Sequence, residues 1–241
     1  MSKGMPGTAG ALDWNARLQL LAAQARAPEL RRFYEAGAVA MNTPIEQVPL
    51  MALDIETTGL DFLQHGIVSV GLLPLSLRRI HCGKAQYWVT QPGTQLHADS
   101  VAFHHITHSD IRHAPKLTHI LGDLLEAMAG RVMVVHYRAI ERGFLDQAVR
   151  RQLGEGFEFP VIDTMQLEAR LHRKVKPSWW DRLRNRPPAS LRLADARSRY
   201  NLPQYHAHHA LTDALGTAEL LQAQVATHYS PGTPVSKLWV E

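Results

Sequence analysis

The sequence predicts an α/β protein in which helices cover both faces of a mixed β-sheet, and three observations support this prediction. Hydrophobic residues make up 45% of the 241 residues and charged residues 20%, which excludes a disordered chain and allows a substantial core. Apolar segments of strand length follow one another closely between residues 51 and 90, as hairpins do. From residue 117 onward, helical and strand-like segments alternate, which is typical of a sheet flanked by helices.

We expect an N-terminal helical arm, residues 1–47, before the main domain. Its first 11 residues are small and glycine-rich, and we expect them to be flexible. Asp13 is placed to cap a helix. The apolar stripe of this helix comprises Leu18, Leu21, Ala22 and Ala25. A second helix begins at Pro28 and stops at Gly37. The arm either packs on the domain or docks a partner, and the sequence leaves both roles open.

Hydrophobic periodicity defines the elements of the main domain, residues 48–228, and residues 229–241 form a tail. Strands are predicted over Met51–Glu56, Gly66–Leu75, part of Ile80–Thr90, Arg131–His136 and Val161–Asp163. Helices are predicted over Leu117–Ala129, Arg138–Leu153, Met165–Leu171, Leu191–Tyr200 and Leu211–Gln224. Asp163 and Thr164 are expected to cap the third of these helices.

Charge and cysteine content restrict the partners and the compartment. The net charge of +4 favours polyanions without proving them, because many proteins this basic bind nothing acidic. Cys82 is the single cysteine, so an intramolecular disulfide and a cysteine-based zinc cluster are excluded. The most apolar segment, Ile67–Leu77, is too short to cross a bilayer and is interrupted by Gly71 and Pro74. We therefore expect a cytoplasmic protein with no membrane partner.

Asp54 and Glu56 stand at the end of the first apolar strand. Side chains alternate along a strand, so these two carboxylates leave the backbone on the same face. They repel each other there, and such a pair persists if it is protonated, strongly solvated or bound to a cation. Oxygen ligands of this kind suit Mg²⁺ or Mn²⁺. The alternative is that the pair merely opens an exposed loop, since the sharp strand exit Thr57–Leu60 follows.

Further candidate residues lie near the starts of two later helices. Glu141 lies in the early turns of the helix after His136, where an acidic residue often only complements the helix dipole. Asp146 is the rival carboxylate but falls on a different helix face. Near the C-terminus, His208 and Asp213 converge if His208 sits in the loop before the last helix, from where a histidine can take a proton from a water. A solvated histidine-rich loop is the alternative.

Taken together, these segments resemble the DEDD superfamily of 3′→5′ exonucleases, in its histidine-containing branch. That branch includes the proofreading epsilon subunit of bacterial replicative DNA polymerase, ribonuclease T and oligoribonuclease. The first motif is matched by residues 54–60, the second by residues 136–145 and the third by residues 208–213. The resemblance covers about residues 48 to 225 and leaves the arm outside.

The resemblance implies a ribonuclease-H-like fold with a mixed five-stranded sheet and a site that binds two divalent cations, Mg²⁺ or Mn²⁺. The cations would be held by Asp54, Glu56, Glu141 and Asp213. His208 would be the general base. The terminal nucleotide would be contacted by Thr57, Thr58, Gly59, Leu60 and His136. Two positions depart from the family pattern, which usually has Asp at Glu141 and Asn at Tyr137. Glu keeps the charge and the ligand type of Asp but is longer by one methylene.

The implied activity is metal-dependent removal of nucleoside 5′-monophosphates from single-stranded or frayed DNA 3′ ends, in repair or in proofreading beside a DNA polymerase. The T-T-G-L form of the first motif resembles the DNA-proofreading group more than oligoribonuclease. Three alternatives stay open: trimming of RNA, a nucleic-acid-binding module with weak or lost catalysis, and a small-nucleotide phosphodiesterase.

A basic, proline-rich loop over Lys174–Ser190 contains Trp179 and Trp180. Cations interleaved with aromatic rings are typical of surfaces that follow a single strand and stack its bases. A tryptophan pair beside prolines is as often a packed corner. Both interpretations of the loop stay open.

Overall fold

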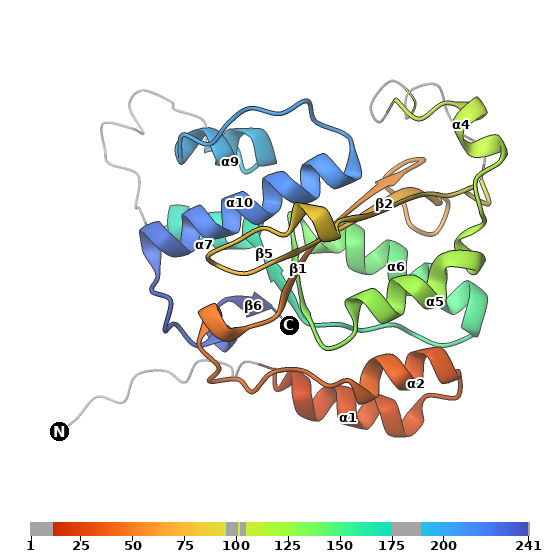
Figure 1. Ribbon diagram of the computed structural model, residues 1–241, viewed down its shortest axis with the longest axis horizontal. Helices are drawn as coiled ribbons and strands as arrows, with labels where there is room; N and C mark the ends of the chain where they lie inside the picture. Colours follow the sequence, from red (N-terminus) through yellow and green to blue (C-terminus); the bar gives the residue numbers. More distant parts are fainter. Residues whose placement is uncertain (1–11, 95–100, 102–104, 175–188, 241) are drawn as a thin grey trace.

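The structure is a computed structural model, and it describes residues 12–94, 101, 105–174 and 189–240 (Figure 1). A six-stranded mixed sheet with the order β3-β2-β1-β4-β5-β6 forms its centre. The strands are β1 (Leu50–Thr57), β2 (Ile67–Leu75), β3 (Gln86–Val89), β4 (Val132–Val135), β5 (Val161–Asp163) and β6 (Trp239–Val240). β1 pairs antiparallel with β2 and parallel with β4, so the sheet combines a hairpin half with a parallel half. The α/β class and mixed sheet predicted from the sequence are confirmed.

Helices cover both faces of this sheet (Figure 1). The longest, α10 (Ala210–His228), crosses one face over β1, β2 and β4. α5 (Leu117–Met128) and α6 (Arg138–Leu153) lie on the other side. α7 (Thr164–Lys174) and α9 (Leu193–Arg199) pack beside α10. None of the helices in the described ranges has the length and apolarity needed to cross a bilayer.

A glycine in β2 lets α10 approach the sheet closely. A Cβ atom placed on Gly71 would lie 2.6 Å from the backbone carbon of Ala210 and from the backbone nitrogen of Leu211. No side chain fits in that space, because real Cβ contacts are longer. Gly71 is the register partner of Asp54 in β1, so the start of α10 is pressed onto the sheet beside Asp54.

The described part of the arm packs on the domain. It consists of α1 (Trp14–Gln24), which Asp13 caps as predicted, α2 (Pro28–Glu35) and the short 3₁₀ segment Ile45–Gln47. The buried residues of both helices belong to the same hydrophobic core as β1; they include Trp14, Leu18, Leu30, Phe33 and Tyr34. The indole of Trp14 also donates to the carbonyl of Val240 at 3.3 Å. Residues 1–11 lie outside the described ranges.

The structure differs from the expected elements at two places. The predicted count of five strands is wrong, because β6 in the expected tail pairs antiparallel with β5. A two-residue strand shows no alternation of its own, so only its partner reveals it. The short helix α4 (His108–Arg112) was not expected, although Thr107 and Asp110 form a capping box there. Most of the basic loop, including Trp179 and Trp180, lies outside the described residues.

Two leucines of α1 test whether the arm belongs to the core. Leu18 is 1% exposed and Leu20 is 49% exposed on the same helix. We expect Leu18→Ala to lower the free energy of unfolding by about 2–5 kcal/mol, because it removes buried methyl groups and leaves a cavity. The matched control Leu20→Ala should change it by less than about 0.5 kcal/mol. Urea unfolding followed by circular dichroism measures both, and equal effects would contradict the packing of α1 on the domain.

Candidate active site

Three carboxylates converge where β1 ends and α10 begins. One oxygen each from Asp54, Glu56 and Asp213 lies within 4.8 Å of the others. Asp54 and Glu56 share one face of β1, and Asp213 stands in the first turn of α10, which Gly71 allows onto that face. The convergence expected from the sequence is therefore present for these three residues, although Asp213 lies more than 150 positions after the other two.

Burial and mutual repulsion raise the pKa values of these carboxyl groups. The pKa of Asp54 lies well above its ordinary value, first because of burial and then because of the charges of Glu56, Glu141 and Asp213. Burial, with the charge of Asp213, raises the pKa of Glu56 to about 8. Burial also raises the pKa of Asp213, although the amide and charge of His208 oppose the shift. These shifts mean that the protein alone does not fully compensate the negative charges of the three carboxylates.

Glu141 lies at the edge of this cluster. It projects from the first turn of α6, is 2% exposed, and is not part of the group of oxygens within 4.8 Å. Its Oε2 atom has no hydrogen-bond partner among the described residues. Burial raises the pKa of Glu141 well above its ordinary value. A buried carboxylate oxygen without a partner is costly, so it indicates a ligand that the protein itself does not supply.

Asp163, at the end of β5, fixes the helix that carries Glu141. Its carboxylate accepts from the backbone N–H groups of Tyr137 at 3.2 Å and Arg138 at 3.1 Å, at the start of α6. It also accepts from Met165 at 3.0 Å and Gln166 at 3.2 Å, at the start of α7. One buried carboxylate thus caps two helices. The sequence predicted the α7 cap but not the α6 cap, because Tyr137 lies 26 residues upstream.

The residue before α6 adopts a left-handed backbone conformation. Tyr137 has φ 96° and ψ 72°, a region that Asn tolerates better than a bulky residue. This is one of the two positions that depart from the family pattern, which usually has Asn there. The bond from its amide to Asp163 holds the conformation in place.

The exit of β1 is a tight turn held by its own side chains. The Thr57 hydroxyl donates to the Gly59 carbonyl at 2.7 Å, and the buried Thr58 hydroxyl accepts from the Gly66 amide at 3.1 Å. A Cβ atom on Gly59 would lie 2.5 Å from the ring of His65, so a side chain there would require the ring to move. Leu60, by contrast, is 80% exposed.

His208 lies in the loop directly before α10, as its convergence with Asp213 required. Its backbone N–H donates to Asp213 at 2.7 Å, and its φ of 69° places it in the left-handed region. The buried Arg197 anchors this loop, donating to the Pro203 carbonyl at 2.8 Å and to Glu219 of α10 at 2.7 Å. The backbone of His208 is thereby held beside Asp213, and the residue is exposed.

Two further candidates make contacts inside the protein. The ring nitrogens of the half-buried His136 lie 2.8 Å from the Thr164 hydroxyl and 2.8 Å from the Leu191 carbonyl, and burial lowers its pKa. The rival carboxylate Asp146 accepts from the Phe157 amide at 2.7 Å and from Arg150 at 2.8 Å. Asp146 is therefore engaged away from the carboxylate cluster.

The donor set fits divalent cations. The site offers carboxylate oxygens only, their pKa values are raised by burial and by one another, and a buried oxygen of Glu141 has no partner. A cation removes the repulsion and supplies the missing partner at once. Hard ions such as Mg²⁺ and Mn²⁺ prefer oxygen ligands of this type.

Comparisons with known proteins agree with this site. A family model described as Exonuclease (RNase_T) matches residues 51–221. A relative from Rhodobacter capsulatus, named DNA polymerase III subunit epsilon-like protein, is 28% identical over 181 residues, which are 73% of this chain and 24% of the relative. This chain therefore spans only about a quarter of the length of that relative.

Two solved structures share the fold. Exonuclease X in complex with 5′ overhanging duplex DNA has a TM-score of 0.55 and 22% identity, covering 77% of this chain and 96% of that one. The nuclease domain of 3′hExo, a DEDDh family member bound to rAMP, has a TM-score of 0.58 and 14% identity, covering 75% of this chain and 92% of that one.

The residues matched by the family model include all four acidic positions and His208. The exonuclease resemblance predicted from the sequence is confirmed, because the family model matches more than half of the chain: the chain belongs to this exonuclease family.

Proposed function

We propose that this chain hydrolyses single-stranded or frayed DNA from its 3′ end and releases nucleoside 5′-monophosphates. The observation that carries the proposal is the carboxylate cluster of Asp54, Glu56 and Asp213, with the unpartnered oxygen of Glu141 beside it. A module that only binds nucleic acid gains nothing from a cluster of repelling carboxylates, because phosphate is itself negative.

Asp54, Glu56, Asp213 and Glu141 would hold two divalent cations, Mg²⁺ or Mn²⁺. When bound, such cations lower the pKa of an attacking water and stabilise the charge that develops around the phosphorus. The protein holds these ligands in place through three elements: β1 carries two of them, α10 one and α6 one. Asp163 and Gly71 fix the positions of α6 and α10 relative to β1.

His208 is proposed as the general base. The bond from its backbone N–H to Asp213 and the exposure of the residue support this role. An imidazole in such a position takes the proton of the attacking water and passes it to solvent. The anchor provided by Arg197 limits the movement of the loop that carries this group.

The turn Thr57–Leu60 is proposed to receive the terminal nucleotide. Leu60 is exposed and apolar, so it offers a surface for the base or sugar. The hydroxyls of Thr57 and Thr58 are used within the turn, so the backbone around Gly59 is the part open to the substrate. His136 is also proposed to contact the terminal nucleotide, although both of its ring nitrogens already face protein oxygens.

DNA is the proposed substrate, and proofreading beside a DNA polymerase or repair is the proposed role. The epsilon-like name of the Rhodobacter relative and the DNA bound to Exonuclease X support this choice. The rAMP in the 3′hExo structure supports RNA as the alternative substrate. A cytoplasmic location is part of the proposal, and the exposed free thiol of Cys82 is compatible with a reducing compartment.

Digestion of end-labelled strands tests the activity and its polarity. With Mn²⁺, single-stranded DNA labelled at the 5′ end should give a ladder that shortens from the 3′ end, and EDTA should abolish it. Asp54→Asn should lower kcat by about a thousandfold, because it removes a shared ligand. The control Asp123→Asn, at an exposed position on α5, should leave the rate unchanged. Labelled RNA run in parallel decides between the two substrates, and persistence of digestion in EDTA would refute the proposal.

Two variants of Glu141 test its role as a ligand. Glu141→Asp keeps the charge and should retain most of the activity, whereas Glu141→Gln should need much more Mn²⁺ to reach half-maximal rate. The reason is that a neutral amide binds a hard cation far more weakly than a carboxylate. Titrating the rate against Mn²⁺ measures the shift. Full activity of Glu141→Gln at unchanged Mn²⁺ demand would remove Glu141 from the site.

The raised carboxyl pKa values predict how pH and metal affect stability. Between about pH 4.5 and 8 the folded protein keeps a proton on Glu56 that the unfolded chain has released, so stability without metal should fall as pH rises. Melting curves in EDTA should therefore show a lower Tm near pH 8 than near pH 5.5. Added Mn²⁺ should raise Tm more at the higher pH.

The variant Glu56→Gln is the control for this pH effect. It should reduce the fall in Tm, because its side chain does not titrate. A Tm in EDTA that is the same near pH 5.5 and near pH 8 would contradict the raised pKa of Glu56.

A further inference from the structure

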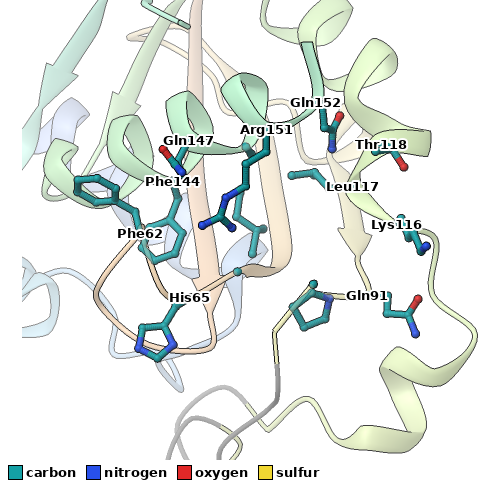
Figure 2. Close-up of a pocket in the computed structure, with 15 residues that line it drawn as sticks. Phe62, His65, Gln91, Lys116, Leu117, Thr118, Phe144, Gln147, Arg151 and Gln152 are labelled. Carbon is teal, nitrogen blue, oxygen red and sulfur yellow. The ribbon is translucent and has the colours of Figure 1, made fainter. Parts of the chain in front are cut away.

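A pocket of about 280 Å³ lies apart from the carboxylate cluster (Figure 2). It is lined by the loop after β1, the segment after β3, the start of α5 and one side of α6. Its volume is near the lower end of the range for small-molecule sites, roughly 300–1,000 Å³. None of the proposed metal ligands lines it.

Aromatic side chains form one wall of this pocket. Phe62 and the buried Phe144 meet edge to face, with their ring centroids 6.3 Å apart. A Cβ atom on Gly143 would lie 2.7 Å from the ring of Phe62, so Gly143 provides the space that Phe62 occupies. Phe62 remains 39% exposed. The wall thus offers an apolar surface of the kind on which a planar base packs.

The charged residues of the pocket are cationic. Arg151 extends from α6 into the space between Phe62 on one side and Gln91 and Lys116 on the other (Figure 2). One of its N–H groups donates to the Leu63 carbonyl at 2.6 Å, which fixes the guanidinium at the rim. Among the described residues that line the pocket, none is an aspartate or a glutamate. Two cations without a carboxylate among these residues favour an anionic ligand.

A second hollow shows that this charge pattern is not general. The space between α2 and α5 is lined by Glu29, Asp123 and Glu126, with Arg32 as its only cation among the described lining residues. The first pocket also presents amide side chains, which both donate and accept hydrogen bonds as base edges require; these are Gln91, Gln147 and Gln152. The aromatic wall suits a base, the amides suit the edge of a base, and the cations suit a phosphate. Together these features match a nucleotide better than a small inorganic anion.

We propose that this pocket binds one nucleotide unit, with its base against Phe62 and Phe144 and its phosphate at Arg151 and Lys116. The identification of the ligand as a nucleotide rests on the proposed function. The chain itself connects the two sites: Asp54 and Glu56 lie in β1, and Phe62 and His65 of the loop that follows line the pocket. The nucleotide is either an upstream unit of the substrate strand or a free 5′-monophosphate.

The pocket holds phosphate through side chains, so binding should not need a divalent cation. We would measure binding of 5′-dAMP, and separately of a short oligodeoxyadenylate, by isothermal titration calorimetry in EDTA. Arg151→Ala should weaken binding about tenfold, because it removes charged hydrogen bonds. The matched control Arg150→Ala, the neighbour on α6 that pairs with Asp146, should leave binding unchanged.

A second variant separates loss of the pocket from loosening of the loop that Arg151 holds. Ala148→Phe keeps Arg151 and its bond to Leu63 but fills the space in front of Phe144, so it should abolish binding. If Ala148→Phe fails to fold, Lys116→Ala replaces it, with an expected loss of about threefold, because Lys116 lies at the far rim.

The outcomes of these binding experiments either distinguish a free 5′-monophosphate from a unit of the substrate strand or overturn the proposal. Loss of 5′-dAMP binding alone identifies a free mononucleotide site, and loss of oligonucleotide binding alone identifies a strand site. If neither ligand binds in EDTA, or if no pocket variant weakens binding, the proposal is overturned. Because no hydrolysis occurs in EDTA, a protein that digests DNA with Mn²⁺ but fails this test loses only the pocket, and the proposed function stands.

Discussion

Repulsion among buried carboxylates is the constraint on which the rest of this structure depends. Asp54, Glu56 and Asp213 are brought within 4.8 Å of one another, and Glu141 adds a buried oxygen without a partner. Burial, together with the charge of Asp213, raises the pKa of Glu56 to about 8, so without a cation such groups take up protons. The rest of the fold keeps these carboxylates together although they repel one another. The repulsion lowers the stability of the folded protein at this place and creates a site that suits cations.

Contacts made by other residues hold the carboxylates together against this repulsion. Gly71 lets the start of α10 lie directly on β2, so Asp213 cannot move away from β1 without separating a helix from the sheet. Asp163 caps α6 and α7 together, which fixes the first turn that carries Glu141. Arg197 ties the loop of His208 to α10. Each of the proposed catalytic groups outside β1 therefore has its own anchor.

The sequence predicted the structure correctly where the local pattern of residues agrees with the burial found in the fold. Alternating side chains predicted that Asp54 and Glu56 share a face, and the Asp13 cap and the Pro28 start predicted both helices of the arm. It was insufficient wherever a partner distant in the chain decides the outcome. The strand β6 exists only because β5 accepts it, and the second cap of Asp163 depends on an amide 26 residues away. The pocket beside Phe62 joins four segments, so no single stretch predicts it. The helix α4 is different, because its capping box was readable and was missed.

The left-handed backbone at Tyr137 restricts how this site can change over evolutionary time. A residue with φ 96° ahead of α6 is hard to replace by valine, isoleucine or threonine, whose branched side chains clash in that conformation. Drift at this position is thus confined to a narrow set of amino acids, whatever contacts their side chains make. The connection between β4 and the helix that carries Glu141 is in this way restricted by the backbone conformation itself, before any contact of the side chain is considered.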